Sequence, residues 1–159
     1  MSEYTKTQLA EKFFNIFSFN PTGHGTTKIL PNQFTPKGKQ KSDSWWVHQP
    51  TTNKLWESHL NGDYSIGQVP VNYEGMIQWA AFDVDIYKNQ LPFEETLTLI
   101  ETMAWPFILI RSKSGGAHAY VFFTEPTAAA PVIEKMKDFT AFFGFADVEV
   151  FPKQGFIGT

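Results

Sequence analysis

Cysteine is absent from the sequence, and this excludes disulfide frameworks, thiolate zinc sites and cysteine nucleophiles. A metal ion bound here would need oxygen or imidazole ligands. The sequence also lacks an apolar run long enough to span a membrane, and its first residues lack the charged and then apolar pattern of a secretory signal. We therefore expect a cytoplasmic protein with no membrane partner.

Basic residues are in the minority, because 13 Lys and Arg stand against 16 Asp and Glu and give a formal net charge of −3. A protein that binds nucleic acid by neutralising phosphates alone usually has the opposite sign. Any contact with nucleic acid must therefore be local or assisted by metal ions. Apolar residues make up 42% of the 159 residues and 16 residues are Phe, which predicts one domain with an aromatic-rich core.

The N-terminal part, residues 1–75, predicts a weakly patterned α/β subregion. Leu9, Phe13 and Phe17 recur at helical spacing after a polar start, which predicts a helix over residues 5–17. The other elements expected in this part are short strands at residues 45–48 and 64–69.

Residues 20–43 are rich in Pro, Gly, Asn and Lys and predict a loop. We interpret it as a solvated surface loop, and the alternative is a basic flap that contacts a nucleic-acid backbone. The basic residues of this stretch are Lys28, Lys37, Lys39 and Lys41. "GHG" at 23–25 lacks the strand before and the helix after that a phosphate-binding loop needs, so we interpret it as a turn. We expect structural roles for His48 and His59.

From residue 76 onward the pattern predicts the element order β-α-β-β-α-β. The expected strands are residues 76–85, 106–112, 117–123 and 147–151, and the expected helices are residues 91–105 and 130–144. This order is that of the RRM-like or ferredoxin-like fold, in which two helices cover one face of a sheet and leave the other face open. The predicted fold class is therefore α+β, a βαββαβ sheet core with an N-terminal α/β extension.

The strand "MIQWAAFDVD" ends in two acids that alternation places on one face, Asp83 and Asp85. Their mutual repulsion must be offset by a cation, by protons or by full exposure to water. Oxygen ligands of this kind favour magnesium or manganese, and Glu149 on a later strand would complete a site for two ions. The alternative is that both acids merely end a strand at the solvent edge.

The segment "RSKSGGAHAYVFF" joins two strands through a glycine turn. Backbone N–H groups, a hydroxyl and cations are all available there to bind a triphosphate, although an ordinary hairpin turn would look the same. The residues concerned are Arg111, Lys113, Ser114, Gly115, Gly116 and His118. Lys153 follows Glu149 closely and is a further cation for phosphate, or an ordinary loop lysine.

Together these three stretches resemble the archaeo-eukaryotic primase superfamily, in particular the primase-polymerases of phages, plasmids and other mobile elements. The resemblance covers the second half of the chain and, more weakly, "WESHLNGDYSIGQVPV" before it. It implies that Asp83, Asp85 and Glu149 hold two Mg²⁺ or Mn²⁺ ions. It also implies that Ser114 and His118 bind the nucleotide phosphates, with Arg111, Lys113, Gly115, Gly116 and Lys153 in support.

The resemblance further implies a template-directed nucleotidyltransferase, a DNA primase or primase-polymerase of nucleic-acid replication. Its partners would be a single-stranded DNA template, NTPs or dNTPs, and a helicase domain or replication proteins in the cytosol of a bacterium or a phage-infected host. The glycine segment is about one residue shorter than in many relatives of this type. The chain also stops at "FPKQGFIGT", where the family usually continues with another strand, so we expect a fragment of a larger polypeptide or a minimal catalytic core.

Two other functions remain open. "GGAHAYVFF" resembles the glycine-aromatic strand of an RNA-recognition module, so a non-catalytic single-stranded nucleic-acid-binding module is the first alternative, with Tyr120 and Phe122 stacking on bases. A rolling-circle or relaxase-type endonuclease is the second, with Tyr87 or Tyr120 as nucleophile. That reaction needs two His residues around one apolar residue, and "AHAYV" supplies one.

Overall fold

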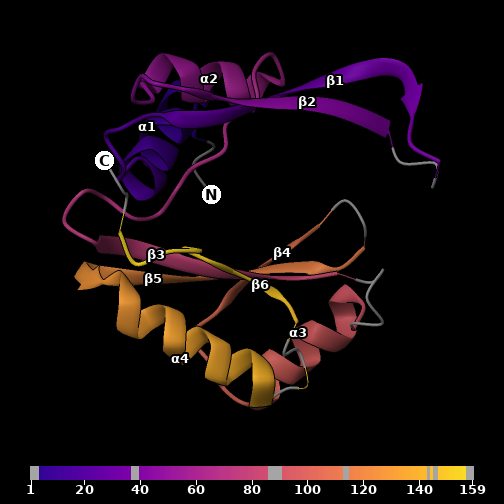
Figure 1. Cartoon of the computed structure of the whole chain (residues 1–159), viewed down its shortest axis with the longest axis vertical. Coiled ribbons are helices and arrows are strands. Elements are labelled where there is room, and N and C mark those ends of the chain that lie inside the picture. Colours follow the sequence, from indigo (N-terminus) through magenta and orange to yellow (C-terminus); the bar gives the residue numbers. More distant parts are fainter. Residues whose placement is uncertain are drawn as a thin grey trace. The chain divides into compact units, whose positions relative to one another are not determined.

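The computed structural model describes residues 4–36, 40–85, 91–112, 115–142, 144 and 147–156. Within these ranges the chain is a mixed α+β protein with four helices and two antiparallel sheets (Figure 1). It divides into two compact units, Met1–Val69 and Pro70–Thr159. No helix among the described residues combines the length and the apolar character that a membrane crossing requires.

Two helices of the first unit, α1 (Lys6–Phe17) and α2 (Asn53–Asn61), pack against each other through aromatic rings. Thr5 caps α1 in a capping box with Gln8, as the polar start of the segment predicted. The ring of Trp56 on α2 lies 5.6 Å from that of Phe13 on α1, and its side chain is almost completely buried. The predicted first helix is confirmed.

The expected loop over residues 20–43 is wrong, because most of it forms an antiparallel hairpin of β1 (His24–Phe34) and β2 (Gln40–Val47). Lys37 and Lys39 lie outside the described residues. "GHG" is likewise not a turn, because its His24 and Gly25 begin β1. Gly23 just before it has a positive φ of 156°, and a Cβ there would overlap the carbonyl oxygen of Val47, so only glycine fits. Residues 64–69 form no strand, and Gly67 makes one isolated bridge with Gly25.

Helix α2 was not predicted, although its boundary signals are present in the sequence. Thr52 accepts a hydrogen bond from Leu55 N–H at the N-terminus, and Gly62 adopts the left-handed conformation (φ 84°) at the C-terminus. His59, expected to be structural, bonds through Nδ1 to the carbonyl oxygen of Tyr64 at 2.9 Å.

The second unit contains β3 (Met76–Val84), α3 (Phe93–Thr102), β4 (Ile108–Arg111), β5 (Ala117–Ala128), α4 (Ala129–Phe142) and β6 (Glu149–Phe151). This is the order of elements that the sequence predicted, with shifted boundaries. The strands form one antiparallel sheet in the order β4-β5-β3-β6. Strand β5 extends to Ala128, five residues beyond the predicted end.

Helices α3 and α4 lie on the same side of this sheet (Figure 1). The core under them is aromatic. The buried ring of Phe82 on β3 contacts Phe107 at 5.2 Å between ring centroids, and Phe107 contacts Phe139 on α4 at 5.5 Å. Because side chains alternate along a strand, the neighbours of Phe82, Ala81 and Asp83, point to the face of the sheet away from these helices.

Candidate active site

A row of three polar residues crosses the face of the four-stranded sheet that points away from α3 and α4, which we call the helix-free face. Asp83 on β3 lies directly opposite His118 on β5 and directly opposite Glu149 on β6. Residues paired in register on antiparallel strands share a face, with Cβ atoms about 4.5–5.5 Å apart. Residues 83, 118 and 149, far apart in sequence, are therefore adjacent in the sheet.

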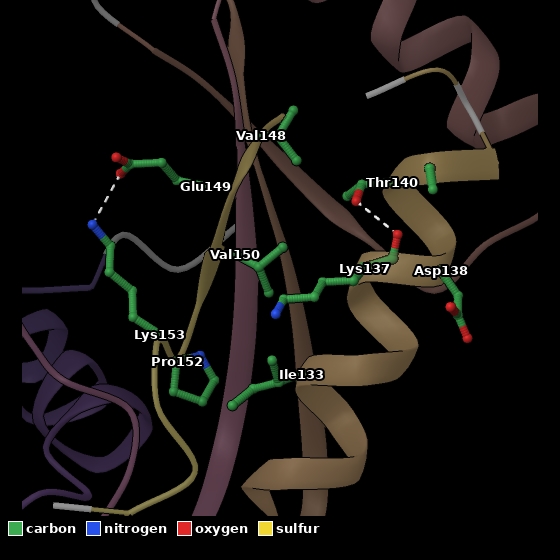
Figure 2. A pocket seen from close by; sticks show the side chains of 10 residues that line it. Ile133, Lys137, Asp138, Thr140, Val148, Glu149, Val150, Pro152 and Lys153 are labelled. Atoms are coloured by element: carbon green, nitrogen blue, oxygen red, sulfur yellow. Dashed lines mark hydrogen bonds and ion pairs between the residues drawn. The ribbon is translucent and has the colours of Figure 1, made fainter. Parts of the chain in front are cut away.

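A close contact joins His118 to Asp83 within this row, and an ion pair joins Glu149 to Lys153. Nε2 of His118 lies 3.3 Å from Oδ1 of Asp83, an oxygen with almost no solvent exposure. Nζ of Lys153 lies 3.3 Å from Oε2 of Glu149. Figure 2 shows Glu149 and Lys153 on the side of β6 away from α4, whereas Val150 points toward α4. A hollow of about 540 Å³ lies on that second side, between α4 and β6.

The donor chemistry of the row fits a divalent cation, because carboxylate oxygens are the ligands that magnesium and manganese prefer. Asp85 follows the last residue of β3 and is half-buried. The side chains themselves do not converge, since Asp83 meets His118 and Glu149 meets Lys153. Among the described residues no group of three or more His, Asp or Glu side chains is arranged to hold a metal ion. The backbone register therefore suits a metal site, and its side chains would have to reorient.

The glycine turn between β4 and β5 is closed by its own hydrogen bonds. Gly115 N–H donates to the carbonyl oxygen of Ser112 at 3.1 Å, and Ser112 N–H donates to that of Gly116 at 3.0 Å. The carbonyl oxygen of Gly115 accepts from Phe93 N–H at the start of α3. Gly115 N–H, proposed for phosphate, is thus already used within the turn. Lys113 and Ser114 lie outside the described residues.

Gly116 has a packing role that the sequence did not reveal. A Cβ at this position would overlap the carbonyl oxygen of Val84 and would lie 3.5 Å from Cα of Asp85. The start of β5 can therefore approach the end of β3 only because residue 116 has no side chain.

Arg111 lies on the other face of the sheet from His118. It pairs in register with Ala117, one residue before His118, and successive residues of a strand point to opposite faces. Its guanidinium pairs with Glu94 on α3 and lies 4.4 Å from the ring centroid of Phe93. The side-chain hydrogen bond from Arg111 lowers the pKa of Glu94. The structure does not bring Arg111 together with the row of His118, Asp83 and Glu149.

Aromatic side chains occupy the next positions of the same face. Tyr120 lies opposite Ala81, and its ring centroid is 6.5 Å from that of His118, 5.9 Å from that of Trp79 and 6.1 Å from that of Phe122. The rings of Tyr120 and Phe122 are stacked, with 11° between their planes. Burial raises the pKa of Tyr120, and the charge of Asp83 raises it further. Alternation along β3 places Trp79 on this face as well.

A family model described as the archaeo-eukaryotic primase domain of TOTE conflict systems matches residues 19–156. The match includes the whole four-stranded sheet and the hairpin of the first unit. No curated protein matches the sequence.

Proposed function

The chain belongs to the archaeo-eukaryotic primase domain family of TOTE conflict systems, and we propose that it is a primase-like nucleotidyltransferase that joins nucleotides on a single-stranded DNA template. The observation that carries this proposal is the register that aligns His118, Asp83 and Glu149 across three strands on the helix-free face. This face offers acids, a histidine and aromatic rings side by side, the groups that nucleotidyl transfer needs.

We assign the second unit to the RRM-like or ferredoxin-like βαββαβ class. The element order and the strand order β4-β5-β3-β6, with both helices on one side, support this assignment. In such a sheet we expect the two central strands to carry residues that contact the nucleic acid or nucleotide. Here the central strands are β3, with Asp83, and β5, with His118.

Asp83, Asp85 and Glu149 are proposed to hold two Mg²⁺ or Mn²⁺ ions. Such ions, when bound, supply charge neutralisation and activation of a primer 3′-hydroxyl. The carboxylates meet the donor requirement, and to bind an ion Asp83 would have to turn from His118 and Glu149 from Lys153.

The other residues of the row would position the triphosphate. His118 donates from Nε2 or Nδ1 to phosphate oxygens, and its contact with Asp83 fixes the orientation of the ring. The side chain of Lys153 is 61% exposed, so its ammonium can reach a phosphate near Glu149. Family resemblance adds Ser114 and Lys113. Arg111 is left out of this set because it pairs with Glu94 on the other face.

The test is incorporation of labelled NTPs and dNTPs on a single-stranded DNA template, with and without primer, in magnesium or manganese. Asp83→Asn and Glu149→Gln, which keep side-chain shape, are expected to lower incorporation about 100-fold or more. The exposed helix variant Glu101→Gln is the matched control and should keep wild-type activity. Folding of each variant is checked by thermal unfolding. Near-normal synthesis by Asp83→Asn would exclude the proposed role of this acid.

The stacked rings of Tyr120 and Phe122 favour a second candidate function, a non-catalytic module that binds single strands. Binding that survives a chelator, together with no synthesis in either metal, would establish it. The nuclease alternative gains no such observation, because the other three histidines lie in the first unit, and Tyr87 lies outside the described residues.

A further inference from the structure

The β1–β2 hairpin is a two-stranded ribbon whose outer part is exposed. In β2 the residues from Gln40 to Trp45 are all exposed, and so are most residues of β1 beyond Thr26. Large apolar side chains are among them, since Ile29 is 61% exposed, Phe34 58% and Trp45 49%. A two-stranded hairpin with no covered face is marginal in water, so such a surface is typical of a binding element.

Positive charge is concentrated in the stretch of sequence that includes β1 and the start of β2. Residues 12–42 contain five lysines and no Asp, Glu or Arg. The remaining 8 of the 13 basic residues and all 16 acidic residues lie elsewhere, so a chain with a net charge of −3 has a stretch of charge +5. Such a stretch attracts phosphate locally, although the whole chain is acidic.

The register gathers basic and aromatic side chains on one face of the ribbon. Lys28 pairs with Asp43, and Thr26 pairs with Trp45, so these residues share a face. Alternation along β2 adds Lys41 to it. Neither lysine forms an ion pair with another described residue.

We propose that this face, formed by Lys28, Lys41 and Trp45, binds single-stranded nucleic acid. The lysines neutralise backbone phosphates, and the exposed indole stacks on a base, which is the combination that sequence-tolerant single-strand binders use. Asp43 on the same face weakens the interaction without cancelling it, because two cations face one acid. Lys37 and Lys39 lie outside the described residues and are not part of the site. The inference needs no catalysis and is independent of the acids on the four-stranded sheet.

The experiment measures fluorescence anisotropy of a labelled mixed-sequence single-stranded oligonucleotide with the full chain. It is run over a range of salt concentrations, without nucleotide or divalent metal. The double variant Lys28→Gln/Lys41→Gln is expected to bind about tenfold more weakly at low salt. Its log–log salt slope should shrink by about 1.4, or about 0.7 for each lysine that no longer neutralises a phosphate. Lys54→Gln/Lys135→Gln removes the same charge from exposed helix positions and should change affinity by less than about twofold.

Two further variants test the face without removing a lysine. Trp45→Ala is expected to weaken binding about tenfold with an unchanged salt slope, because it removes stacking and not charge. Asp43→Asn is expected to tighten binding, a gain that misfolding would not produce. Thermal unfolding confirms that the variants fold.

The proposal is overturned if the ribbon and control double variants lose affinity equally, if Asp43→Asn does not tighten binding, or if duplex DNA binds more tightly than the single strand. If the wild-type protein synthesises nothing and the ribbon variants still lose binding, the proposed nucleotidyltransferase function is refuted and the ribbon site is supported. Synthesis by wild type with unchanged binding in the ribbon variants would refute the ribbon site alone.

Discussion

Gly116→Ala is the substitution for which the structure gives the most direct expectation. The added Cβ would overlap the carbonyl oxygen of Val84 and would lie 3.1 Å from its carbonyl carbon. Both of these atoms are backbone, so no side-chain rotation relieves the overlap, and the end of β3 and the start of β5 must move apart. Overpacking of this kind costs about 1–3 kcal/mol. Removing a glycine from the unfolded chain offsets about 0.4–1 kcal/mol of that cost.

We therefore expect Gly116→Ala to lower the free energy of unfolding by about 1–2 kcal/mol, measured by urea denaturation. The separation of the strands should also reach the row on the helix-free face. The Asp83–His118 pair is the next pair in register after Val84–Ala117, which lies beside the overlap at residue 116. NMR of the His118 ring would then show that it has moved away from Asp83, to which it lies at 3.3 Å in wild type.

Gly25→Ala is the matched control. Residue 25 also lies at the start of a strand, but a Cβ there would meet its nearest atom, the carbonyl oxygen of Gly67, at 3.6 Å, an ordinary contact. Its unfolding free energy should change by less than about 1 kcal/mol. If Gly116→Ala is as stable as wild type, the packing argument is refuted. Lower nucleotide binding at unchanged stability would then give Gly116 the phosphate-binding role expected from the sequence.

Two further substitutions test the electrostatics and a buried polar contact. Because burial raises the pKa of Tyr120 more than Asp83 does, Asp83→Asn should lower that pKa only part of the way to 10.0. In wild type the folded state keeps the Tyr120 proton to higher pH than the unfolded state does. The free energy of unfolding should therefore fall as the pH rises above 10.0, the ordinary pKa of tyrosine. The pKa of Tyr120 is measured from phenolate absorbance after the signal of Tyr120→Phe is subtracted. The loss of stability is measured by unfolding at alkaline pH, where Tyr120→Phe should lose less stability than wild type. A pKa that is the same in Asp83→Asn would contradict the charge effect. Tyr64→Phe removes the hydroxyl 2.9 Å from Nε2 of the buried His24, and chemical denaturation should show a decrease in stability of about 1–3 kcal/mol. Wild-type stability would show that this nitrogen needs no partner.

The order of elements in the second half of the chain was predictable because its helices and strands have clear local patterns. Along the strand around Phe82, successive side chains point toward α3 and α4 or away from them, and α3 has Glu94 and Glu95 at its start, as the helix dipole favours. These local patterns fixed the element order. They also predicted that Asp83 and His118 point to the helix-free face, because alternation decides the face once a strand is located.

The first half was less predictable for a physical reason. The β1–β2 ribbon buries neither face along most of its length, so its sequence has no alternation of apolar and polar residues to detect. Pro31 and Asn32, the second with a positive φ of 60°, lie inside β1 where the register shifts, and such residues are typical of loops. No element was predicted over α2, although the cap at Thr52 and the stop at Gly62 are signals that indicate a helix.

Side-chain partners were beyond sequence reasoning altogether. Arg111 was expected near phosphate because it precedes the glycine turn, but a guanidinium at the end of a short strand pairs with whichever acid the fold presents on its face, and this is Glu94. In the same way Lys153 reaches Glu149 because the chain turns after β6. The first contact joins residues 17 positions apart and depends on tertiary structure, whereas the second joins residues four positions apart through a local turn.

The position of Glu149 is determined by the core on the other side of β6. Val150 is only 8% exposed and pairs in register with the buried Phe82, on the side of the sheet that α4 covers. A slip of one residue would bring the carboxylate of Glu149 under α4 and expose Val150, which costs both the desolvation of a charge and the loss of apolar burial. Packing of Val150 therefore specifies that Glu149 lies beside Asp83. The arrangement of acids on the helix-free face is thus a consequence of hydrophobic burial on the other side of the sheet, and it does not require the acids to attract one another.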